Sequence, residues 1–109
     1  MPTFPPVTRE DCLNYLGIAG EDDQLVCRNV DLARQAATEM LRGSVDYDVA
    51  TYFPEPDARI HKLVLAYMAE LYEDRGTTAK AVKAKHAWVH DMEMQLRLEI
   101  ARKKREAAT

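Results

Sequence analysis

The 109-residue chain contains only four glycines and two cysteines, and it has no long apolar run. With so few glycines, the sequence offers no glycine-rich loop of the kind that cradles phosphate groups. The longest uncharged stretch in its most apolar segment runs from Leu63 to Ala69. That stretch is far shorter than the ~20 apolar residues that a membrane span requires. The sequence therefore argues against a phosphate-binding loop and against a transmembrane helix.

The two cysteines, Cys12 and Cys27, lack CxxC spacing and have apolar neighbours. The first ten residues, MPTFPPVTRE, contain neither a basic segment nor an apolar segment of the kind found in signal peptides. We therefore expect synthesis in the cytoplasm, where thiols stay reduced, and buried cysteines rather than a disulfide.

The composition is that of an ordinary globular protein, with 47% hydrophobic and 30% charged residues. Its length allows one domain with one core. The net charge of −3 is unevenly distributed. Residues 1–74 carry 6 basic and 14 acidic side chains, a net charge of −8, whereas residues 75–109 carry 9 basic and 4 acidic, a net charge of +5. Such a bipolar chain can attract copies of itself or a charged partner.

Apolar spacing predicts an all-α fold, a small bundle of about four helices that ends in a long C-terminal helix. After a proline-rich extended arm over residues 1–7, Thr8 begins a short helix with a capping-box pattern, and Gly17 suits its left-handed end. A second helix is expected over 21–42, closed by Gly43. A third begins near Asp57 and ends before Gly76.

The fourth helix is expected to start at Thr77 or Thr78 and to run towards residue 105. At 1.5 Å per residue, ~28 residues would span roughly 40 Å, more than so small a body can cover. Beyond Ile100 the sequence is ARKKREAAT, without a large apolar residue. We therefore expect residues 97–109 to form a projecting basic helix end.

Residues 44–56, SVDYDVATYFPEP, interrupt the helical pattern. Apolar and polar residues alternate there, which favours an extended loop with a short β segment. Because a long loop in a small domain usually has a function, we regard its larger side chains as a candidate subunit interface or channel loop: Val45, Tyr47, Val49, Tyr52 and Phe53.

No catalytic, cofactor or metal site emerges from the sequence. His86 and His90 lie four residues apart on one helix face, as two zinc ligands would, but two ligands do not make a site. Glu93 and Asp91 are expected to point elsewhere on that helix. Neither cysteine has a histidine near it in sequence, and acidic pairs such as Asp22 and Asp23 are better explained by a helix N-terminus. We therefore expect a protein that is not an enzyme.

The basic residues near the C-terminus are the remaining candidates for binding. They could form a solvated helix end, neutralise DNA phosphates, or dock on an acidic protein surface. The strongly acidic remainder of the chain would oppose DNA, so we favour docking on a protein partner by the candidate residues Arg97, Arg102, Lys103, Lys104 and Arg105.

Two stretches resemble the head-tail connector (adaptor, or head completion) family of tailed bacteriophages. The first is TREDCLNYLGI at 8–18, followed by EDDQL at 21–25 and an alanine-rich helix. The second runs from Ile60 to Arg75, where LVLA leads to LYEDR, similar to the family's Leu-Tyr-Glu-Asn-Arg helix ending. Asp74 stands where Asn is frequent in the family. Tyr72 and Arg75 are the candidate residues that anchor this helix end.

The resemblance implies a non-enzymatic virion protein that forms a ring of about twelve subunits with repeated head-to-tail contacts. Its implied partners are the portal protein of the DNA-filled head and the next neck or tail-completion protein. The ring would extend the DNA channel, with DNA only as its passing contents. The alternative is a small helical protein that binds DNA or assists its packaging, which predicts tight, salt-dependent binding of duplex DNA.

Overall fold

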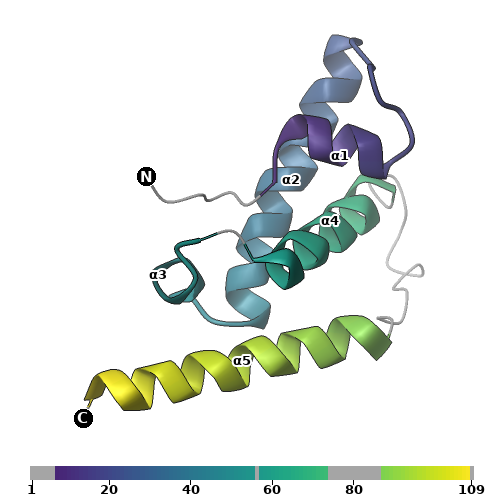
Figure 1. Cartoon of the computed structure of the whole chain (residues 1–109). Coiled ribbons are helices and arrows are strands. Elements are labelled where there is room, and N and C mark those ends of the chain that lie inside the picture. The colour runs from purple at the N-terminus through teal and green to yellow at the C-terminus, as the bar shows by residue number, and fades with distance from the viewer. Residues whose placement is uncertain (1–6, 56, 74–86, 109) are drawn as a thin grey trace.

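The computed structural model describes residues 7–55, 57–73 and 87–108. Over these residues the fold is all-α, as predicted, and contains no strand. The described helices are α1 (Arg9–Tyr15), α2 (Gln24–Ser44), α3 (Val49–Tyr52), α4 (Ala58–Glu73) and α5 (Ala87–Ala108). Figure 1 shows α2 and α4 crossing, with α1 beside them and α5 running beneath.

Helix α1 begins and ends as the sequence predicts. The Asp11 backbone N–H donates to Thr8 Oγ1 at 3.1 Å, and the Thr8 N–H donates to Asp11 Oδ2 at 3.0 Å, so the capping box is complete. Gly17 follows the helix with φ +78°, a left-handed conformation that favours glycine. The Ile18 N–H then donates to the Leu13 carbonyl at 2.9 Å, which closes the last turn.

Helix α2 differs from its predicted range at both ends. It starts at Gln24 because the Asp23 carboxylate caps it, accepting from the N–H groups of Leu25 and Val26 at 2.9 and 3.1 Å. Gly43 was expected to close the helix but lies inside it, and the helix ends at Ser44. Asp57 caps α4 as predicted, since its carboxylate accepts from the Arg59 N–H at 2.9 Å.

The core lies mainly between α2 and α4, with α1 packed across both. Val30, Ala37 and Leu41 of α2 are fully buried, as are Leu63, Val64 and Met68 of α4. Val7 belongs to this core rather than to an exposed arm, because its side chain is buried and its carbonyl accepts from Arg34. The rest of the predicted N-terminal arm lies outside the described residues.

The expectation of a short β segment in residues 44–56 was wrong: Val49–Tyr52 form the short helix α3, and residues 45–48 and 53–55 form turns and irregular structure. The Asp48 N–H donates to Asp46 Oδ1 at 2.8 Å, and the Asp48 carbonyl accepts from the Tyr52 N–H at 3.2 Å. Such local bonds favour a turn over a strand. The buried side chains here recur every four residues, at Val45, Val49 and Phe53, which is a helical spacing. In the sequence, the alternation of apolar and polar residues had favoured a strand over this helical spacing.

Helix α5 lies against α4 and α3, and its residues Val89, Leu96 and Ile100 are buried. The expected start of this helix, near Thr77 or Thr78, lies outside the described residues, as do Arg75 and His86. Tyr72, the other candidate anchor at the end of α4, is half-buried against the core. Among the described helices, none combines the length and apolar character needed to cross a membrane.

Candidate interaction surface

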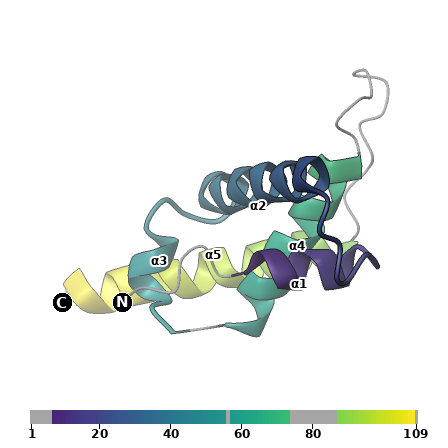
Figure 2. The same ribbon diagram turned by 90° about the horizontal axis from the view of Figure 1, so that it is seen from above.

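The basic end of α5 contacts the segment between α2 and α4. The Lys103 ammonium donates to the Tyr52 carbonyl at 3.0 Å and lies 4.2 Å from the centre of the Phe53 ring. The Lys104 ammonium lies 2.9 Å from Asp46 Oδ2 and 3.5 Å from Asp48 Oδ2. Figure 2 shows α3 beside the C-terminal half of α5. The two surfaces that the sequence suggested separately, the basic helix end and the aromatic segment, therefore meet within one subunit.

The prediction that the helix projects from residue 97 onwards therefore needs correction. Arg97 donates from Nε to the Ser44 carbonyl at 2.6 Å, and Ile100 is buried. The contacts with α3 extend to Lys104. Arg97, Arg102, Lys104 and Arg105 are all exposed, and the side chain of Arg102 is 59% exposed against 45% for Arg97 and 42% for Lys104. Arg102 contacts Glu99 and Glu106 of its own helix at about 4 Å. Arg102 is thus a more accessible docking candidate than Arg97 or Lys104.

Opposite charges hold α5 to the α3 segment, which is residues 45–53. The Asp48 backbone N–H and the Lys104 ammonium both donate to Asp46, which lowers the pKa of that carboxyl group. The same carboxylate raises the pKa of Lys104. Nearby, the Arg59 guanidinium of α4 lies 2.7 Å from Glu99 of α5 and 3.1 Å from Asp57. Opposite charges therefore hold α5 on both α3 and α4.

A buried carboxylate on α5 was missed by the sequence reasoning. Glu93 was expected only to lie on another side of the helix from His86 and His90. Its side chain is 1% exposed and accepts a hydrogen bond from the Tyr67 hydroxyl of α4. Burial and the contact with Glu93 raise the pKa of Tyr67, so the phenol stays protonated and can donate. The spacing 89, 93, 96, 100 follows the buried stripe of α5 and could have revealed this position.

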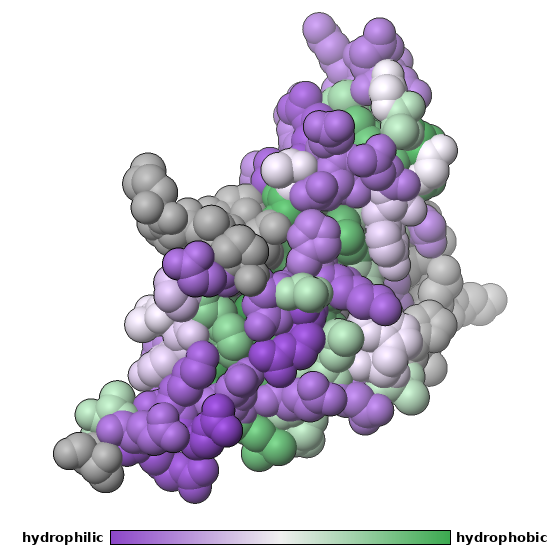
Figure 3. Space-filling model, viewed as in Figure 1, coloured by the Kyte–Doolittle hydropathy of each residue, from purple (hydrophilic) through white to green (hydrophobic). Residues whose placement is uncertain are grey.

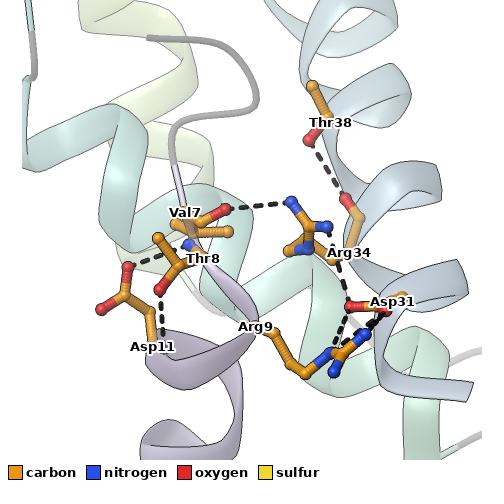
Figure 4. A network of polar contacts seen from close by, with 7 residues as sticks. All are labelled: Val7, Thr8, Arg9, Asp11, Asp31, Arg34 and Thr38. Carbon is orange, nitrogen blue, oxygen red and sulfur yellow. Dashed lines mark hydrogen bonds and ion pairs between the residues drawn. The ribbon is translucent and has the colours of Figure 1, made fainter. Parts of the chain in front are cut away.

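A second polar cluster joins α1 to α2. Figure 4 shows Arg9 and Arg34 both directed at Asp31. The Arg9 guanidinium donates to both carboxylate oxygens of Asp31 and lowers the pKa of that group. Arg34 also donates to the Val7 carbonyl at 3.2 Å. An open hollow of about 600 Å³ lies beside this cluster, lined in part by Glu21, Asp22, Cys27, Arg28 and Leu32.

No group of three or more potential metal ligands occurs among the described residues. His90 is exposed, and its Nδ1 lies 3.9 Å from Glu93 Oε1. Cys12 is fully buried, which raises the pKa of its thiol to about 11 and keeps it protonated at neutral pH. Cys12 and Cys27 are both free and buried, as predicted.

Several large apolar side chains remain on the surface: Tyr15, Leu25, Leu32, Tyr47, Met94 and Leu98. Of the candidate interface residues, Tyr47 is the most exposed, whereas Val45, Val49 and Phe53 belong to the core. Figure 3 shows hydrophilic side chains gathered over the C-terminal part of α5, with apolar surface at the lower edge of its middle.

Comparison of the chain with protein-family models, with curated proteins and with solved structures yields no match.

Proposed function

We propose that the protein is a structural, non-enzymatic virion component of a tailed bacteriophage that assembles into a ring between the portal and the neck or tail. It would be made in the host cytoplasm and would extend the channel through which the DNA passes. Its binding partners are then copies of itself, the portal protein and the next neck or tail-completion protein.

The observation that carries the proposal is that one small helical subunit exposes apolar side chains on two different helices. Leu25 and Leu32 face outward from α2, and Met94 and Leu98 face outward from α5. A ring needs this kind of subunit, because each copy must present one surface to the copy before it and a different one to the copy after it. The two stretches that resemble the connector family supply α1, the start of α2, and α4, and they include the core residues Cys12 and Leu13 of α1 and the buried side of α4.

Imaging of the protein together with portal particles of the matching phage tests the proposal. We expect negative-stain images to show an added ring on the portal, and we expect the isolated chain to bind duplex DNA weakly at 150 mM salt. Portal particles that gain no density would contradict the connector function. Tight DNA binding that weakens steeply with salt would instead support a DNA-binding or packaging accessory protein.

The exposed side of the basic end of α5 that carries Arg102 is the surface that we assign to the portal. Removing residues 97–109 would be a poor test, because it also deletes the buried Ile100. The substitution Arg102→Glu changes an exposed charge only, and Arg42→Glu on α2 serves as the matched control. We expect the Arg102 variant to form a folded subunit that attaches poorly to portal particles, while the Arg42 variant attaches normally. Equal attachment of the two would refute this assignment.

A further inference from the structure

The outward side of α2 carries two exposed leucines, with the exposed Arg28 between them and the exposed Asp22 before them. Leu25 is 67% exposed and Leu32 is 54% exposed, and a separation of seven residues places them on the same side of the helix. The exposed Ala36 follows them, and Asp22 lies at the N-terminal end. We call these residues, Asp22, Leu25, Leu32 and Ala36, the α2 face.

The outward side of α5 also carries exposed apolar side chains, and it has the opposite charge at its far end. Met94 is 50% exposed and Leu98 is 63% exposed, and the exposed Ala101 and Arg105 follow them. Steps of four, three and four residues keep these side chains on one side of the helix, as in a coiled-coil seam. We call Met94, Leu98, Ala101 and Arg105 the α5 face. The opposite side of the helix, with Leu96 and Ile100, packs against the body.

The two faces cannot meet within one subunit. Figure 1 shows the N-terminal end of α2 at the top of the molecule and the C-terminal end of α5 at the lower left. Their charges nevertheless complement each other, because Asp22 stands at the start of the α2 face and Arg105 at the end of the α5 face. Antiparallel packing of two helices would bring these ends together.

We propose that the α5 face of one copy packs antiparallel on the α2 face of the next copy. In this arrangement Leu25 lies opposite Ala101 of the second copy, Leu32 lies opposite its Met94, and Asp22 lies near its Arg105. The Arg97 side chain does not obstruct the contact, because it is held on its own subunit by the Ser44 carbonyl. This inference deepens the proposed function, since the pairing is head-to-tail and leaves one free face at each end.

Cross-linking between two variants that each carry one added cysteine tests the pairing directly. A mixture of Leu25→Cys and Ala101→Cys chains should form a disulfide-linked dimer in a glutathione redox buffer, because the Cα atoms of bridged cysteines lie within about 7 Å of each other. A mixture of Leu25→Cys with Ala87→Cys is the matched control, because Ala87 is an exposed alanine at the other end of α5. We expect little cross-linking in that control, and none in the unsubstituted chain, whose two cysteines are buried.

Three results would overturn the inference. The first is equal cross-linking of the Ala87 mixture, which would rule out the antiparallel arrangement. The second is cross-linking of either single variant with itself as fast as the mixture, which would indicate pairing of like faces. The third is no cross-linking in any mixture at concentrations where the unsubstituted chain associates or where rings form on portal particles.

Side-chain substitutions give an independent measure of the same contact. Leu32→Ala should weaken self-association about tenfold, because roughly half of a leucine side chain loses its apolar contact. Tyr15→Ala, which removes an exposed side chain from α1, should have no effect. Asp22→Arg should weaken association about two- to fivefold, and the added substitution Arg105→Asp should restore it. Sedimentation equilibrium measures all four, and equal values for Leu32→Ala and Tyr15→Ala would contradict the pairing.

Failure of this inference can be distinguished from failure of the proposed function. If rings form on portal particles while the Leu25 and Ala101 variants do not cross-link, the connector function stands and the assigned faces are wrong. If the cross-link forms but portal particles gain no density, the chain associates head-to-tail and the connector function is wrong.

Discussion

This molecule has two parts, and different forces hold the helices together within each of them. The part built from α1, α2 and α4 is joined mainly by apolar packing around fully buried residues such as Leu41, Leu63 and Met68. The part built from α3 and α5 relies on fewer apolar contacts. There, ammonium and guanidinium groups bind carbonyls and carboxylates, and one carboxylate is buried under a tyrosine hydroxyl.

This difference predicts different responses to substitution and to pH. Apolar packing does not depend on protonation, and its loss is costly because a cavity remains. Charged contacts at a partly exposed surface contribute little individually and weaken when one partner is neutralised. We therefore expect the packing of α1, α2 and α4 to contribute most of the stability. The contacts of α3 and α5 should respond more to pH and to binding partners.

The largest effect should come from the apolar core. Leu63→Ala removes a fully buried side chain between α2 and α4 and should lower the free energy of unfolding by about 2–5 kcal/mol. Urea unfolding followed by circular dichroism measures the change. Leu25→Ala is the matched control, since that leucine is exposed on α2, and it should change stability by less than about 0.5 kcal/mol. Similar losses in both variants would contradict the assigned core.

The next largest effect should come from the buried carboxylate. Tyr67→Phe removes the hydroxyl that donates to Glu93 and leaves that acceptor without one of its partners. We expect a loss of about 1–3 kcal/mol, the cost of removing one hydrogen-bond partner from a buried polar group. Tyr15→Phe removes a hydroxyl from an exposed tyrosine and should leave stability unchanged in the same urea titration. A neutral Tyr67→Phe variant would mean that Glu93 does not depend on this bond.

A smaller effect should come from the lysine that joins α5 to α3. Lys103→Ala removes the bond to the Tyr52 carbonyl and the contact with the Phe53 ring, together worth about 1 kcal/mol. We expect faster amide hydrogen exchange in the last two turns of α5, with little change in α4. Arg102→Ala on the exposed side of the same turn should change exchange less. Equal acceleration in the two variants would show that α3 does not hold the helix end.

The smallest effect should be the acid sensitivity of the same contact. Asp46 has a lowered pKa in the folded protein, so the unfolded chain binds its proton more readily. The stabilising contribution is therefore present above about pH 4, the ordinary aspartate pKa, and is lost as the pH falls through the folded-state value.

Thermal unfolding between pH 6 and pH 3 checks this expectation. Asp46→Asn should lower the melting temperature slightly at pH 6 and should show a smaller further decrease on acidification than the unsubstituted protein. Asp22→Asn, which changes an exposed carboxyl group outside the α3 segment, is the control. An unchanged pH dependence in Asp46→Asn would exclude Asp46 as a source of the acid sensitivity.

Local sequence determined much of the fold by itself. The capping box at Thr8, the left-handed Gly17 and the Asp57 cap depend on hydrogen bonds between residues at most five apart, so they could be predicted from the sequence. The apolar stripe of α4 likewise marked its buried side, because a helix repeats every 3.6 residues whatever packs against it.

Other features depended on residues far apart in the chain. Residues 45–53 supported both an alternating and a four-residue pattern, and only packing of Val49 and Phe53 into the core selects the helix. Glu93 is buried beside Tyr67, 26 positions away, whose hydroxyl donates a hydrogen bond to it. Lys103 and Lys104 were expected to project, but they bind groups about 50 to 60 positions away. Local hydrogen bonds and periodicity therefore determined the helices, whereas the tertiary structure decided which charges are buried, which are paired and which remain available to a partner.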